Sequence, residues 1–87
     1  MSEVRDNLRN IHGELTFVDG HDDAILGVVE RPGCKPFVVY DTHVILGELI
    51  SQGMGYEESR EFFDFNIQGA WVGDQTPAYI DRGEVIL

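Results

Sequence analysis

The stretch that decides the fold is FVVYDTHVILGELISQ, residues 37–52. Phe37–Tyr40 is an apolar and aromatic run of the kind that forms a buried strand. Asp41 and Thr42 are both favourable helix N-caps. Apolar side chains then recur at helical spacing, namely Ile45, Leu46, Leu49 and Ile50. The stretch therefore predicts a strand followed by a helix over His43–Gln52, with Gly53 as its terminator.

Two further strands are predicted upstream of this stretch. Ala24–Glu30 is apolar apart from its last residue, and the turn Arg31–Lys35 contains a Pro-Gly pair that favours chain reversal. Leu15–Val18 has the composition of another strand. Together the three runs predict an antiparallel meander. Residues 1–12 are polar, with apolar residues four and three apart, which indicates either a short amphipathic helix or a flexible terminus.

Downstream, a second helix is predicted over Tyr56–Ile67, with Gly69 at its end. One face of this helix is expected to carry Tyr56, Ser59, Phe63 and Ile67. The opposite side carries Glu57, Glu58, Glu61 and Asp64. Ala78–Asp81 is expected to return as a final strand, and Glu84–Leu87 to extend it or to form an arm.

These elements predict an α+β fold, with a small antiparallel sheet of about three to four strands, two helices and the order β-β-β-α-α-β. The chain has 87 residues, which suits one domain over 1–87. A chain of this length buries only about 60–65% of the surface that it exposes when unfolded, so its core must be small.

Composition narrows the class of function. The formal net charge is -10, which disfavours direct binding to nucleic acid or to an anionic membrane. Cys34 is the single cysteine, so no intramolecular disulfide can form. The beginning of the chain lacks the pattern of a signal peptide, and the apolar runs are far too short to span a membrane. We therefore expect a cytoplasmic protein.

No residue pattern indicates a reaction, a cofactor or a metal. Asp19–Asp23 supplies carboxylates, but its spacing does not match an EF-hand loop, and a solvated turn is the simpler interpretation. His12, His21 and His43 lack the four-residue spacing of helical zinc ligands. Cys34 follows a turn without an identifiable base nearby in the sequence. The sequence thus favours a binding protein over an enzyme, without cofactor or metal.

Acidic residues concentrate in the second half of the chain. From Asp41 to Asp81, eight acidic residues accompany Arg60 as the only basic one. Such a run is often merely a solvated face. Alternatively, carboxylates held on a rigid helix can satisfy the Arg and Lys groups that grip phosphates in a nucleic-acid-binding protein. The candidate partner-binding residues are Asp41, Glu48, Tyr56, Glu57, Glu58, Glu61, Asp64, Trp71 and Asp74. Core packing is the competing role for the aromatic residues, favoured for Tyr79 and open for Trp71.

Three segments carry a resemblance to a known group of proteins. They are FVVYD (37–41), GMGYEE (53–58) and FFDFNIQGAWVGDQTP (62–77). In this region, Phe37–Asp81, the chain resembles short uncharacterised proteins of tailed bacteriophages, most specifically over Asn66–Pro77. The resemblance implies a phage setting and supplies no functional residues.

A phage setting and the acidic second half together suggest an anti-defence inhibitor. The first hypothesis is an anti-CRISPR that binds a basic nucleic-acid-binding groove of a host effector subunit, by DNA mimicry or steric block. The alternative is a non-enzymatic, oligomeric phage protein that is structural or sequesters a small ligand, with its apolar strands as the surface for a homodimer. An anionic ligand would require a basic pocket, for which the sequence offers few basic side chains.

Overall fold

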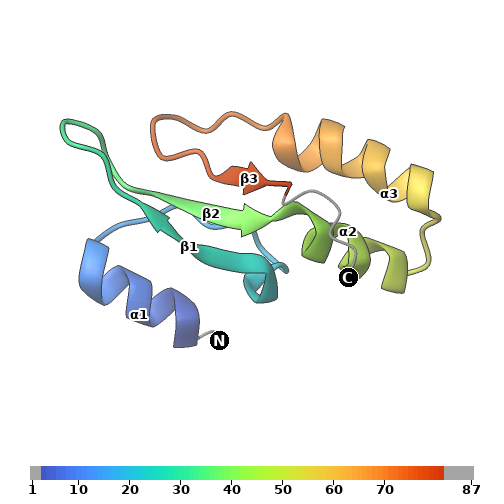
Figure 1. The fold of residues 1–87 in the computed structure, drawn as a ribbon, viewed down its shortest axis with the longest axis horizontal. Helices are drawn as coiled ribbons and strands as arrows, with labels where there is room; N and C mark the ends of the chain where they lie inside the picture. Colours follow the sequence, from blue (N-terminus) through green and yellow to red (C-terminus); the bar gives the residue numbers. More distant parts are fainter. Residues whose placement is uncertain (1–2, 82–87) are drawn as a thin grey trace.

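A computed structural model describes residues 3–81 and confirms the α+β class (Figure 1). The order of the main elements is α-β-β-α-α-β, with three helices around a three-stranded mixed sheet. Their bounds are α1 Glu3–His12, β1 Ile25–Val29, β2 Phe37–Asp41, α2 Thr42–Ser51, α3 Tyr56–Phe62 and β3 Ala78–Ile80. A 3₁₀ turn, Asp22–Ala24, precedes β1, and a π-helix, Phe63–Gln68, continues α3. Glu84–Leu87 lies outside the described residues.

The hairpin of β1 and β2 forms as predicted. The two strands pair antiparallel, with Val28 opposite Val38 and Val29 opposite Phe37. At the tip, the amide of Cys34 donates to the carbonyl of Arg31 at 3.0 Å. Gly33 has φ of +81°, and with Pro32 before it the geometry matches a type II turn. The Pro-Gly pair therefore fixes the shape of this hairpin end.

The direction of the last strand was predicted wrongly. β3 pairs with β2 in parallel, with Tyr79 opposite Tyr40, so the sheet is mixed rather than antiparallel. Parallel neighbours cannot be joined by a tight turn and need a long crossover. Residues 42–77 make that crossover and carry α2, α3 and the π-helix.

The predicted strand Leu15–Val18 is also wrong. This segment packs against the core as irregular chain, and β1 is an edge strand of the sheet. The amide of Val18 donates to the hydroxyl of Tyr40 at 2.6 Å. A side chain from the central strand thus satisfies a backbone group that a strand ladder would otherwise have paired.

The first helix of the crossover, α2, starts where its cap signal indicated. The carboxylate of Asp41 accepts from the amides of His43 and Val44, at 2.9 and 3.2 Å. The buried face of α2 carries Ile45, Leu46 and Leu49, whereas Ile50, predicted for the same stripe, is 41% exposed.

The core lies where α2, α3 and the π-helix meet the sheet. Val38, Tyr40 and Ile45 have no exposed surface, and Phe63 has almost none. The ring of Tyr79 stacks on Tyr40 and meets Phe63 edge to face, with centroids 5.8 and 5.2 Å apart. The core-packing role favoured for Tyr79 is therefore confirmed.

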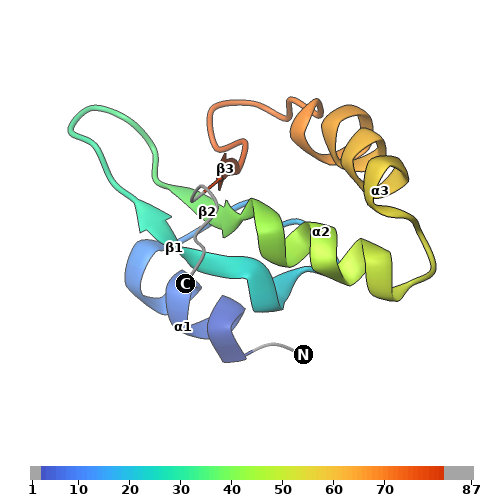
Figure 2. The same ribbon diagram turned by 45° about the vertical axis from the view of Figure 1, so that its right-hand side comes forward.

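The helix α1 contacts the rest of the protein through polar groups, and none of its residues is buried. In both Figures 1 and 2 it lies beside β1, whereas α3 lies on the side of β3. Arg5 donates to both carboxylate oxygens of Asp22, at 2.9 and 3.0 Å, and to the carbonyl of Val18. Arg5 and Arg9 both lie over the ring of Phe17. A helix is therefore the structure of residues 3–12, one of the two alternatives for this segment.

Replacing Tyr40 by Phe should lower the free energy of unfolding by about 1–3 kcal/mol, because it leaves the Val18 amide without an acceptor. Tyr79→Phe is the matched control, since no hydrogen bond of its hydroxyl is among those found in the described residues. Urea unfolding at pH 7 measures both variants. Equal stability of the two would contradict a structural role for the Tyr40 hydroxyl.

The two stacked tyrosines should also make stability fall at alkaline pH. Burial raises the pKa of Tyr79 to about 12, with a smaller effect of Tyr40, and burial raises the pKa of Tyr40 as well. Unfolded tyrosine ionises near pH ~10. Above that pH the unfolded chain has lost protons that the folded chain keeps, so stability should be insensitive to these groups below pH ~10 and fall above it.

Urea unfolding between pH 8 and 11 tests this dependence. The fall should be shallower in Tyr79→Phe, which removes one of the titrating groups. Tyr56→Phe is the control, because the Tyr56 ring is already 59% exposed in the folded protein. The same alkaline fall in all three proteins would refute the link to the Tyr79 hydroxyl.

Candidate functional site

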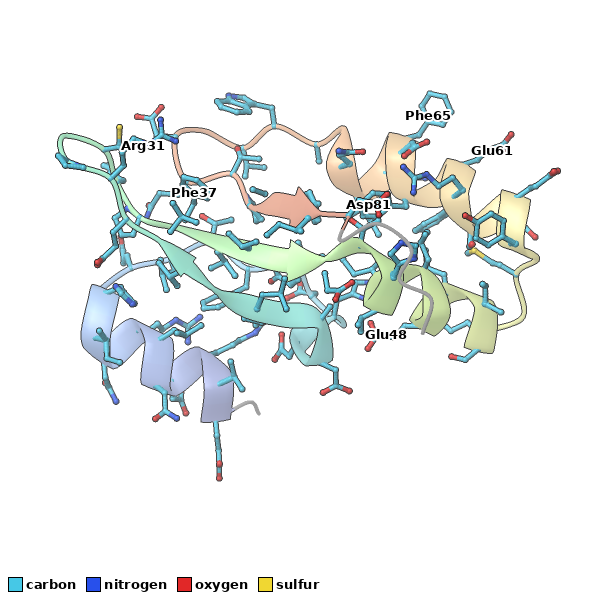
Figure 3. The ribbon with its side chains drawn as sticks, in the orientation of Figure 1. Arg31, Phe37, Glu48, Glu61, Phe65 and Asp81 are labelled. Carbon is cyan, nitrogen blue, oxygen red and sulfur yellow. The ribbon has the colours of Figure 1, made fainter. Side chains whose placement is uncertain are left out.

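The outer face of α3 and the π-helix combines carboxylates with an exposed aromatic ring. Glu57, Glu58, Glu61 and Asp64 are all exposed on it. Phe65 follows Asp64 at the C-terminal end of this row and is 80% exposed. Figure 3 shows Phe65 and Glu61 projecting away from the body of the protein on the same side of the helix. We call these five residues the α3 face.

The helix places the five side chains together because its other side is fixed by the core. Ser59, Phe63 and Ile67 recur every four residues and are buried. The side chains between them are therefore directed outward. Ser59, Phe63 and Ile67 lie on one face, as predicted, and the core buries it, whereas Tyr56, assigned to the same face, is exposed. Glu57 and Glu58 in the first turn also stabilise the helix dipole.

Arg60 is the one basic residue of α3, and it is directed to the edge of the α3 face. Its Nε lies 3.6 Å from the carboxylate of Asp64, and its guanidinium lies over the Phe63 ring, 5.8 Å from the centroid. It therefore offsets part of the Asp64 charge and leaves Glu57, Glu58 and Glu61 without a basic neighbour within ion-pair distance among the described residues.

Two predicted partner-binding carboxylates are engaged inside the fold. Asp41 is 3% exposed and caps α2, so its carboxylate does not belong to an accessible surface. Glu48 contacts the Nδ1 atom of buried His21 at 2.5 Å. Both residues were predicted from charge alone, and charge does not distinguish a cap or a buried pair from a free carboxylate.

Trp71 and Asp74 lie in a different place from the α3 face. Both line an open cavity near the β1–β2 hairpin, together with Arg31, Lys35 and Phe37. Trp71 is 76% exposed, which settles the choice between core packing and exposure. The structure thus places four of the predicted carboxylates on the α3 face, Trp71 and Asp74 at this cavity, and Asp41 and Glu48 on neither surface.

Phe65 was not singled out from the sequence, although a signal was present. In a helix with Ser59 and Phe63 buried, residue 65 falls on the opposite side. An aromatic residue at that position breaks the amphipathic pattern. Single apolar side chains are common on protein surfaces, so this signal was weak.

The histidines and the carboxylates of Asp19–Asp23 were the residues considered as metal ligands. Among residues 3–81, no group of three or more His, Cys, Asp or Glu side chains is arranged to hold a metal ion. Asp19 and Asp22 lie against Arg5, and the three histidines contact Glu30, Glu48 and Asp81 respectively. Cys34 is a free, exposed thiol. Across the part of the chain that the structure describes, the helices are too short and too polar to cross a membrane.

Comparison of the chain with protein-family models, with curated proteins and with solved structures gives no match. The functional inference therefore depends on the two surfaces themselves.

The end of the π-helix requires glycine at position 69. A Cβ there would lie 2.9 Å from the carbonyl oxygen of Asp64 and 3.3 Å from that of Phe65, and both are backbone atoms. Gly69→Ala should therefore displace the segment that presents Phe65 and destabilise the fold by about 1–3 kcal/mol.

Gly47→Ala is the matched control, because a Cβ at this exposed position in α2 meets nothing within 4 Å. It should stabilise the protein by about 0.5–1 kcal/mol through helix propensity. Thermal unfolding distinguishes the two substitutions. Stabilisation by both would show that the π-helix end tolerates a side chain.

Proposed function

We propose that this protein inhibits a host defence complex by inserting its α3 face into a basic, nucleic-acid-binding groove. An anti-CRISPR role is the form that the resemblance to phage proteins favours. The observation that carries the proposal is the row of four exposed carboxylates on α3 and the π-helix, with the exposed ring of Phe65 at its C-terminal end. Phe65 adds to these carboxylates an apolar side chain that a partner can bury.

The chemistry of the α3 face suits a partner built to bind phosphates. Carboxylates accept the same charge-assisted hydrogen bonds from Arg and Lys that phosphate oxygens accept. Side chains four residues apart, such as Glu57 and Glu61, lie about 5–6 Å apart at their Cβ atoms, so neighbouring basic groups can be contacted together. Complementary charge accelerates association and makes it sensitive to salt.

Phe65 supplies what charge alone cannot. An aromatic side chain that fills a pocket at the centre of an interface commonly dominates the binding energy, and surrounding polar contacts exclude water from it. The proposed interface is therefore Phe65 as the anchor at one end, with Glu57, Glu58, Glu61 and Asp64 along the helix before it. Tyr56, exposed at the start of α3, is a candidate for its rim.

The test requires the partner, which affinity capture from the native host identifies. Binding is then measured for the intact protein and for a variant that carries Glu57→Gln, Glu58→Gln and Glu61→Gln. We expect the affinity to fall at least about tenfold at physiological salt and its salt dependence to become shallower. Phe65→Ala should weaken binding by a similar factor without changing the salt dependence.

A control variant carries Glu3→Gln, Glu14→Gln and Asp23→Asn, which removes the same charge from exposed positions outside α3. It should bind like the intact protein. The captured partner's affinity for its own nucleic acid should fall in the presence of the inhibitor. Binding that tolerates the α3 substitutions, or a complex that still takes up nucleic acid, would sink the proposal.

A further inference from the structure

A second surface carries basic side chains, in contrast to the carboxylates of the α3 face. The open cavity between the β1–β2 hairpin and the loop after the π-helix has a volume of about 480 Å³. This lies within the range of small-ligand sites, about 300–1,000 Å³. Arg31 and Lys35 flank the hairpin turn on one side of it, and Trp71 and Asp74 come from the loop on the other. Figure 3 shows Arg31 and Phe37 at this hairpin end.

The two basic side chains in this cavity differ from the other described ones. Arg5, Arg9 and Arg60 each contact a carboxylate within 4.0 Å. Arg31 and Lys35 are the remaining basic side chains within residues 3–81, and neither forms such an ion pair. Both line the same cavity. In a chain with a net charge of -10, two such cations that line one cavity are available for an anionic ligand.

The same cavity has aromatic walls. Trp71 is 76% exposed, and Phe37 lies at the start of β2 beneath the hairpin. An indole ring left in water presents a planar surface on which another planar ring can stack. The cavity therefore combines cations and an aromatic face, which is the combination that recognises a phosphate attached to an aromatic ring.

Both sides of the cavity are held in place by hydrogen bonds. The Cys34–Arg31 backbone bond closes the hairpin turn. The side-chain amide of Gln75 donates to the carbonyls of Glu14 and Pro36, at 2.8 and 3.0 Å, and so ties the loop to the start of β2. The hydroxyl of Thr76 accepts from the amide of Val72 and donates to the carbonyl of Gly73. The loop that presents Trp71 is thus ordered before any ligand binds, which reduces the entropy lost on binding.

We propose that this cavity binds a nucleoside monophosphate. Arg31 and Lys35 hold the phosphate, Trp71 stacks on the base, and the carboxylate of Asp74 accepts from a ribose hydroxyl or an exocyclic amine. A longer nucleic acid is disfavoured, because its further phosphates would meet the acidic remainder of the surface. The site uses no residue of the α3 face, so the tests of AMP binding and the tests of the inhibitor proposal can fail separately.

Trp71 is the only tryptophan of the chain, so its fluorescence reports on this cavity directly. Titration with AMP should quench the fluorescence with saturation, with a dissociation constant below about 1 mM. Adenosine and inorganic phosphate, which each offer half of the ligand, should bind at least about tenfold more weakly. Single-stranded DNA of ten nucleotides should bind no more tightly than AMP. Equilibrium dialysis with labelled AMP confirms the values without an optical signal.

The double substitution Arg31→Gln and Lys35→Gln should raise the dissociation constant for AMP at least about tenfold. Arg9→Gln with Arg60→Gln is the matched control, which makes the same charge change outside the cavity and should leave AMP binding within about threefold of the intact protein. Trp71→Leu, followed by dialysis, should weaken binding about tenfold. Circular dichroism checks that each variant is folded.

Several results would overturn the site. They are the absence of saturable AMP binding at millimolar concentration, equal binding of adenosine and AMP, and unchanged binding in the hairpin double variant. Tighter binding of the ten-nucleotide strand would assign the cavity to a nucleic-acid end instead of a mononucleotide.

Discussion

The arrangement of this protein depends on the parallel pairing of β3 with β2. Because Tyr79 pairs with Tyr40 in the same direction, the chain must return to the hairpin end of the sheet before β3 begins. The crossover covers the sheet with α2 and α3 and gives Phe63 its place against Tyr79. It also brings the loop of Trp71 beside the hairpin, where Gln75 bonds to the carbonyl of Pro36. Both candidate surfaces follow from one strand direction.

Local signals were sufficient for the elements and insufficient for their pairing. The N-cap at Asp41, the Pro-Gly hairpin turn, most of the apolar stripe of α2 and most of the predicted face of α3 each lie in a few consecutive residues, and the structure has them. The direction of β3 has no local signal, because the composition of a three-residue strand favours neither a parallel nor an antiparallel partner. An antiparallel β3 would begin at the other end of β2, so the wrong direction also hid the cavity beside the hairpin.

The failures at Leu15–Val18 and Asp41 have a common cause. A β-prone run predicts an extended chain, but the Tyr40 hydroxyl takes the Val18 amide and no ladder forms in the described residues. Asp41 was both an N-cap and a surface carboxylate in the sequence interpretation, and capping α2 buries it. In each case one polar group had two uses, and the use that satisfies a buried partner prevailed. Such competition is decided by tertiary structure.

An acidic face and a cationic cavity can coexist in so small a domain because salt limits the range of charge. The molecule is 38 Å along its longest axis, and the hairpin and the start of α3 lie towards its two ends (Figure 1). The Debye length at physiological ionic strength is about 8 Å, so exposed charges at one end are largely screened at the other. Local composition therefore decides what each end attracts.

At the hairpin, the cavity is lined by two basic side chains, Arg31 and Lys35, and by one carboxylate, that of Asp74. The neighbouring carboxylate of Glu30 contacts His12, so the cavity keeps a net positive charge. At α3, only Arg60 opposes the carboxylates, and it is taken up by Asp64 and the Phe63 ring. The net charge of the chain describes neither end.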